Sequence, residues 1–154
     1  MYGIVLTLHS LVRWLVLGSL LFALYRSYRG LYGKRPYTKF ENSVRIIAAT
    51  AAHIQFVLGV YLYFISPVTN YFISNFSEAV HLREIRFFGM EHATMMLIAV
   101  ALISTGSSKA KRKTEPRAKF KTQAIWLTIA LIVILSSIPW PFSPLVHRPW
   151  LRPF

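Results

Sequence analysis

The chain contains no cysteine and no aspartate among its 154 residues, and glutamate supplies all 5 of its acidic side chains. The absence of cysteine excludes disulfides, thiolate metal sites and cysteine nucleophiles together. With so few carboxylates, no set of nucleophile, base and orienting group of the kind that hydrolases use can be assembled. Internal repeats, Gly-rich phosphate loops and low-complexity stretches are also missing. These absences disfavour an independent enzyme and favour an electron-transfer or accessory subunit.

The apolar side chains gather in four stretches, at about residues 4–25, 44–66, 87–105 and 124–138. With 55% hydrophobic residues and a mean hydropathy of +0.45, the chain needs the lipid bilayer as its solvent. A helix of about 20 apolar residues crosses the hydrocarbon core. The pattern therefore predicts an all-α fold, an integral membrane four-helix up-down-up-down bundle that forms one domain over residues 1–154.

The positive charge is concentrated between the apolar stretches. Of 18 Lys and Arg residues, six lie from Arg26 to Arg45 and seven from Lys109 to Lys121. This distribution is typical of cytoplasmic loops, so both termini are expected on the non-cytoplasmic side of the membrane. Topology and anionic lipid head groups account for the net charge of +13, and no nucleic acid is expected as a partner. No cation precedes the first stretch, which indicates a retained span rather than a signal peptide.

The outer connections carry the helix-stop signals. Pro67 ends the second span, and Val68–Phe76 is expected to be irregular or to lie flat. The pair Ser77 and Glu78 is typical of a helix start, which would place the beginning of the third helix above the membrane. Several prolines prevent the tail, residues 139–154, from continuing the fourth helix, and its aromatic side chains suit the outer interface.

Function is expected where polarity persists inside the spans, because ionisable groups there are costly unless they are paired or used. Six such residues are present: His9, Arg13, His53, Gln55, Glu91 and His92. At about 1.5 Å of rise per residue, His9 lies about 9 Å below the outer end of its helix, and His92 roughly 8 to 12 Å below the outer end of its own. The two depths match.

The first and third helices run parallel and can face each other diagonally across a four-helix core. Histidines at matched depth, His9 and His92, can then point at a flat ligand between them, which is the arrangement of a bis-histidine haem. Gly18 and Gly89 would let a macrocycle approach the backbone. The alternative is that each histidine only forms a hydrogen bond between helices. We expect His9 and His92 to be the metal ligands.

The remaining polar residues allow more than one interpretation. His53 has no histidine partner on the fourth helix, so a hydrogen bond in the core is favoured over a second haem or a quinone contact with Gln55. Arg13 needs an anion, which is either Glu91 on the third helix or a haem propionate.

The sequence resembles the small four-helix bacterial membrane proteins called cytochrome B. The resemblance lies in His9 with Arg13-Trp14, in Ala52-His53-Ile54-Gln55 before Gly59, and in Glu91-His92 with Met95-Met96. It covers the first three spans, about two thirds of the chain, and none of its motifs is highly specific. It implies haem b held by intramembrane histidines and electron transfer in or beside a respiratory complex of the bacterial inner membrane.

Three functions therefore compete. The first is a haem b electron carrier with one haem, or two if His53 finds a partner. The second is a cofactor-free accessory subunit of a larger respiratory or other membrane complex. The third is a protein that interacts with quinone or handles metal through His53, Gln55, Glu91 and the methionines.

Overall fold

A computed structural model describes residues 1–143, 146 and 148–150 of the chain, and these residues form an all-helical fold. Four helical segments are long and apolar enough to cross a membrane: α1 (Tyr2–Tyr32), α2 (Lys39–Ile65), a continuous segment Arg83–Arg112 and α7 (Pro116–Ser137). The third segment consists of α5 (Arg83–Arg86), the π-helical turn η1 (Phe87–Glu91) and α6 (His92–Arg112). The predicted all-α, multi-pass membrane fold is confirmed.

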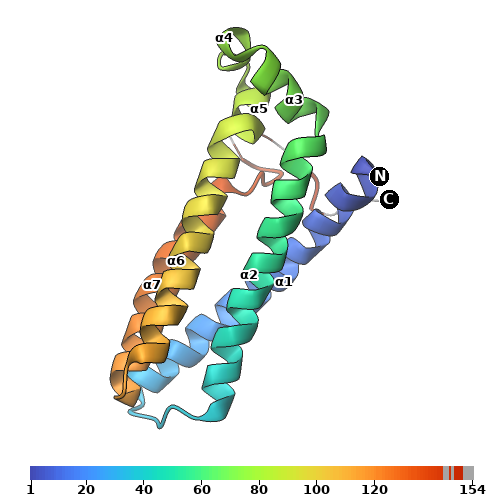
Figure 1. The fold of residues 1–154 in the computed structure, drawn as a ribbon. Helices are drawn as coiled ribbons and strands as arrows, with labels where there is room; N and C mark the ends of the chain where they lie inside the picture. Colours follow the sequence, from blue (N-terminus) through green and yellow to red (C-terminus); the bar gives the residue numbers. More distant parts are fainter. Residues whose placement is uncertain (144–145, 147, 151–154) are drawn as a thin grey trace.

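The four long helices form a closed ring of neighbours. α1 packs against α2 and α7, and α6 packs against the same two helices, so α1 and α6 face each other diagonally, as predicted. Figure 1 shows the α1–α2 and α6–α7 connections at one end of the bundle and α3 to α5 at the other. The two basic connections, predicted to lie on one side of a membrane, are therefore close in space.

The end of the bundle with the basic connections is fixed by polar contacts. Thr38 and Glu41 form a capping box at the start of α2, which satisfies backbone N–H groups that the helix leaves free. The Glu41 carboxylate also pairs with Arg26 of α1. Gln123 of α7 donates a hydrogen bond of 2.7 Å to the Tyr37 hydroxyl. These contacts connect α1, α2 and α7 at the end of the bundle that has the basic connections.

The interior is built from small and aliphatic side chains, which let the helices approach closely. A β-carbon on Gly106 would lie 2.4 Å from Cβ of Trp126, so α6 and α7 meet where only glycine fits. Large apolar side chains, including Leu15, Ile47 and Ile132, are exposed on the outside of the bundle. In water such a surface would be unfavourable, whereas in lipid it is ordinary.

The outer connection differs from the expectation in two ways. Most of Val68–Phe76 is helical rather than irregular, because Ser66 accepts a hydrogen bond from the Val68 amide and Pro67 starts α3 (Pro67–Ser74). Ser77 does not start the third long helix. It lies inside α4 (Phe76–Ala79), a single turn without a side-chain cap, and the long helix begins at Arg83.

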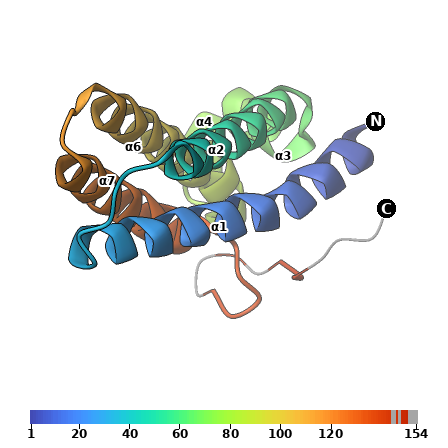
Figure 2. The same ribbon diagram turned by 90° about the horizontal axis from the view of Figure 1, so that it is seen from below.

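The chain turns back after α7 ends at Ser137. The Trp14 ring centre lies 6.2 Å from that of Trp140 and 5.9 Å from that of Trp150. Figure 2 shows this C-terminal segment passing beside α1. The tail predicted for an interface is thus partly folded onto the bundle. The same prediction also covered residues 144–145, 147 and 151–154, which are outside the described part of the chain.

Candidate functional site

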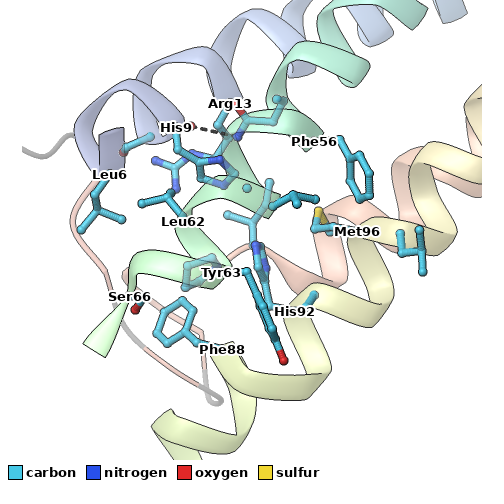
Figure 3. Close-up of a pocket in the computed structure, with 18 of the residues that line it drawn as sticks. Leu6, His9, Arg13, Phe56, Leu62, Tyr63, Ser66, Phe88, His92 and Met96 are labelled. Carbon is cyan, nitrogen blue, oxygen red and sulfur yellow. Dashed lines mark hydrogen bonds between the residues drawn. The ribbon is translucent and has the colours of Figure 1, made fainter. Parts of the chain in front are cut away.

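A cavity of about 450 Å³ lies among the long helices, on the side of the bundle away from the basic connections. All four contribute to its lining, which is mostly apolar. The polar exceptions include His9 and Arg13 from α1, Gln55 from α2, His92 from α6, and Arg148 from the C-terminal segment. Figure 3 shows His9 and His92 reaching into this space from different helices. The volume lies within the usual range of small-molecule and cofactor sites.

The imidazoles of His9 and His92 meet across the diagonal of the bundle. Their ring centres are 6.4 Å apart and their planes are inclined by 76°. Metal–imidazole bonds are about 2.0 to 2.1 Å long and a ring centre lies about 1.2 Å from its nitrogen, so two imidazoles on opposite sides of one iron have centres roughly 6.4 Å apart. The observed separation is compatible with a shared iron, and it is also an ordinary separation for two packed rings.

A backbone carbonyl sets the orientation of His92. Nδ1 of His92 lies 2.8 Å from the carbonyl oxygen of Ser137 in the last turn of α7. Because a carbonyl oxygen only accepts, Nδ1 carries the proton and Nε2 of the neutral ring keeps its lone pair. The bond also satisfies one of the carbonyls that a helix end leaves free. Histidine ligands of metals commonly have such a partner on the second nitrogen.

The π-helical turn η1 stands directly before His92, and single turns of this kind are frequent at functional sites. Tyr63 of α2 donates a hydrogen bond of 2.8 Å to the carbonyl oxygen of Gly89 within this turn. The Phe87 and Phe88 rings pack against the His92 imidazole, with ring centres 5.7 and 6.2 Å from that of the imidazole. These contacts hold the backbone and ring of His92 from two sides.

His9 is positioned by α2. A β-carbon on Gly59 would lie 3.1 Å from Cε1 of His9, and Gln55 donates a 2.9 Å hydrogen bond to the His9 backbone carbonyl. Nδ1 of His9 and Oε1 of Gln55 are buried with no hydrogen-bond partner in the described part of the chain. Buried polar atoms without partners are uncommon in native structures, and a missing ligand or water is one explanation for them.

The glycines selected from sequence, Gly18 and Gly89, do not serve the site as predicted. Gly18 faces open space, and the position of a Gly89 β-carbon is filled by Phe72 of α3. The glycine beside a candidate ligand is Gly59, on a helix whose facing direction the sequence does not specify.

Arg13 and Glu91 do not form a pair, which was one of the two alternatives considered for Arg13. Nε of Arg86 lies 2.7 Å from Glu91, five residues along the same helical segment. Nη2 of Arg13 donates to the Trp150 carbonyl oxygen at 2.8 Å. Nε of Arg13 is buried and has no hydrogen-bond partner among the described residues. The anion for which this guanidinium is suited is thus not Glu91.

His53 and Glu91 lie outside the cavity lining, whereas Gln55 and Met96 belong to it. The His53 ring is exposed, and its Nε2 lies 2.8 Å from the Ser104 hydroxyl of α6. The hydrogen bond favoured from sequence is thus present, but it lies on the outside of the bundle rather than in the core as predicted. The residue set for a quinone or metal site through His53, Gln55 and Glu91 is therefore not brought together.

The described residues contain no group of three or more His or Glu side chains that could hold a bare metal ion. A haem asks less of the protein, because the porphyrin supplies four iron ligands and the chain need supply only the axial ones. Two facing histidines, a mostly apolar cavity, a glycine beside His9 and a guanidinium with a partnerless Nε fit that requirement.

The fold and this site define a multi-pass membrane protein with a buried histidine pair. No family model, curated protein or solved structure shows a significant match to the chain.

Proposed function

We propose that the protein is a b-type haem protein of the bacterial cytoplasmic membrane, with His9 and His92 as axial ligands, which transfers electrons in or beside a larger respiratory complex. The observation that carries the proposal is the imidazole pair itself, with ring centres 6.4 Å apart across the bundle. Both basic connections lie at the other end of the bundle, which supports a topology with cytoplasmic loops and non-cytoplasmic termini.

A bound haem would supply a reversible one-electron iron centre. The chain's own residues would set its properties. Ser137 fixes the His92 tautomer, so that a neutral nitrogen is presented to the iron. The apolar lining excludes water and lowers the local dielectric, and burial of this kind is one of the means by which a protein adjusts a haem potential. No proton transfer or covalent step is required of these residues.

The histidine assignment is tested by haem content in single variants of the purified full-length protein. His9→Ala and His92→Ala should each lower haem per chain by about tenfold or more, because each removes an iron ligand. His53→Ala and His81→Ala are the matched controls, since His53 lies outside the cavity and His81 is exposed. Both controls should keep near one haem per chain in the pyridine haemochrome assay.

The accessory-subunit alternative makes the opposite prediction for the same samples. A colourless wild-type protein whose histidine variants behave like the controls would favour a cofactor-free subunit in which His9 and His92 only connect helices. A wild-type protein with two haems would instead bring His53 back as a ligand, and His53→Ala would then lose one of them.

A further inference from the structure

Arg13, one of the cations that line the cavity, has a buried N–H group without a hydrogen-bond partner in the described part of the chain. Arg13 directs Nη2 to the Trp150 carbonyl oxygen at 2.8 Å, while its Nε is buried with no hydrogen-bond partner in the described residues. A guanidinium suits carboxylates and phosphates, because its adjacent N–H donors match two oxygens of such a group. No Glu of the described chain pairs with this guanidinium: Glu91 bonds to Arg86, and Glu84 to Arg148.

The position of the guanidinium is imposed by the surrounding aromatic residues. Its carbon lies 5.2 Å from the centre of the Trp14 ring. The indole N–H of Trp14 shares the Trp150 carbonyl with it, at 3.3 Å. Trp150 in turn packs against Trp14 and Trp140. The side chain is thus held from the C-terminal segment, while its Nε has no hydrogen-bond partner among the described residues.

Arg13 follows His9 by one helical turn, so both side chains line the same cavity from the same face of α1. A ligand in contact with the imidazole pair is therefore within reach of the guanidinium. Burial of a cation in apolar surroundings is costly unless an anion compensates it. The ligand that best complements the imidazole pair, the apolar lining and the guanidinium is a flat apolar molecule with an acidic group at its edge.

We infer that Arg13 is a carboxylate-binding residue of the haem site, which pairs with a propionate of the porphyrin, and that the Trp150 carbonyl positions it for this contact. The inference rests on the proposed haem function. It adds that the site selects porphyrins with free carboxylates, and it makes the C-terminal segment part of the binding site.

The test compares two ligands that differ only in charge, haem b and its dimethyl ester, in which both carboxylates are blocked. Each is titrated into full-length protein produced without haem, in micelles, and binding is followed by the visible spectrum. Wild-type protein should bind haem b about tenfold more tightly than the ester, the size expected of one charge-assisted hydrogen bond. Equal affinity for the two ligands would overturn the inference and leave the histidine ligation intact.

Variants of Arg13 show whether this residue is the source of the preference. Arg13→Gln should bind the two porphyrins equally, with haem b weakened about tenfold, and Arg13→Lys should keep part of the preference because the charge remains. Arg29→Gln is the matched control, since it removes an exposed cation from the same helix outside the cavity. A preference that survives in Arg13→Gln would also overturn the inference.

The remaining outcomes are equally decisive. If neither porphyrin binds wild-type protein, the proposed function fails and the inference with it. The titration is carried out in micelles that contain phosphatidylcholine, and it is repeated in micelles that contain the anionic lipid phosphatidylglycerol instead. A porphyrin carboxylate at Arg13 predicts the same preference in both lipids, whereas loss of the preference in the anionic lipid would mean that a lipid phosphate occupies the site.

Discussion

Gly59 of α2 lies directly against the imidazole of His9 on α1. A β-carbon at this glycine would be 3.1 Å from Cε1 and 3.7 Å from Nδ1 of the ring. The distance to Cε1 is shorter than an ordinary van der Waals contact. The helix therefore passes the histidine at a distance that only glycine allows without adjustment. The position and tilt of His9 depend on this contact.

Substitution of Gly59 tests that dependence. Gly59→Ala should push the His9 ring and weaken haem binding by about tenfold, which corresponds to the lower range of an overpacked contact. The matched control is Gly18→Ala, because Gly18 has no atom within 4 Å of the added carbon. Haem titration should show a normal affinity for the control. Equal affinities in the two variants would contradict the contact.

A second substitution tests the support of the π-helical turn before His92. Tyr63→Phe removes the hydrogen bond to the Gly89 carbonyl and should lower the free energy of unfolding by about 1 kcal/mol. Tyr61→Phe is the control, since the Tyr61 hydroxyl is exposed and reaches only the Met1 sulfur. The thermal midpoint in detergent is the measurement. A Tyr63→Phe midpoint equal to that of the control would show that the bond contributes nothing.

Part of this site could be predicted from the sequence because helix geometry is regular. A fixed rise per residue places His9 and His92 at matched depth, and the order of four spans places their helices on a diagonal, which the helix contacts confirm. The hydrogen bond of His53 was expected because the fourth helix has no histidine to pair with it. Each of these predictions needed only counting along the chain.

The partners of the key side chains could not be predicted, because they are backbone atoms from distant segments. His92 bonds to a carbonyl 45 residues away and Arg13 to one 137 residues away. A carbonyl is present at every residue, so residue identity carries no signal for these contacts. Glu91 was one of two anions considered for Arg13, but it pairs instead with Arg86, a cation on its own helical segment.

The far end of the bundle should affect stability without affecting the site. Glu41→Gln breaks the ion pair with Arg26 and weakens the capping box, so the free energy of unfolding should fall by about 1 to 2 kcal/mol. Glu115→Gln is the control, because Glu115 is exposed and makes no capping hydrogen bond. Both variants should keep wild-type haem content. A loss of haem in Glu41→Gln would show that the two ends are coupled.

The absence of cysteine makes the topology simple to test. Ser77→Cys and Thr114→Cys place single thiols at opposite ends of the bundle, both on exposed residues. A membrane-impermeant maleimide should label Cys at position 77 in intact spheroplasts and Cys at position 114 only after lysis, because the basic connections are cytoplasmic. The reverse pattern would invert the proposed orientation.

The measurement that tests the central claim most directly is low-temperature EPR of the oxidised, purified protein. Two axial histidines make ferric haem low-spin, and ring planes inclined by 76° favour the strongly anisotropic form of that signal over the rhombic form given by parallel rings. The account predicts a strongly anisotropic low-spin signal that disappears in His9→Ala and in His92→Ala. A high-spin signal in the wild-type protein, or no haem iron signal at all, would contradict the assignment of His9 and His92 as a pair of axial ligands.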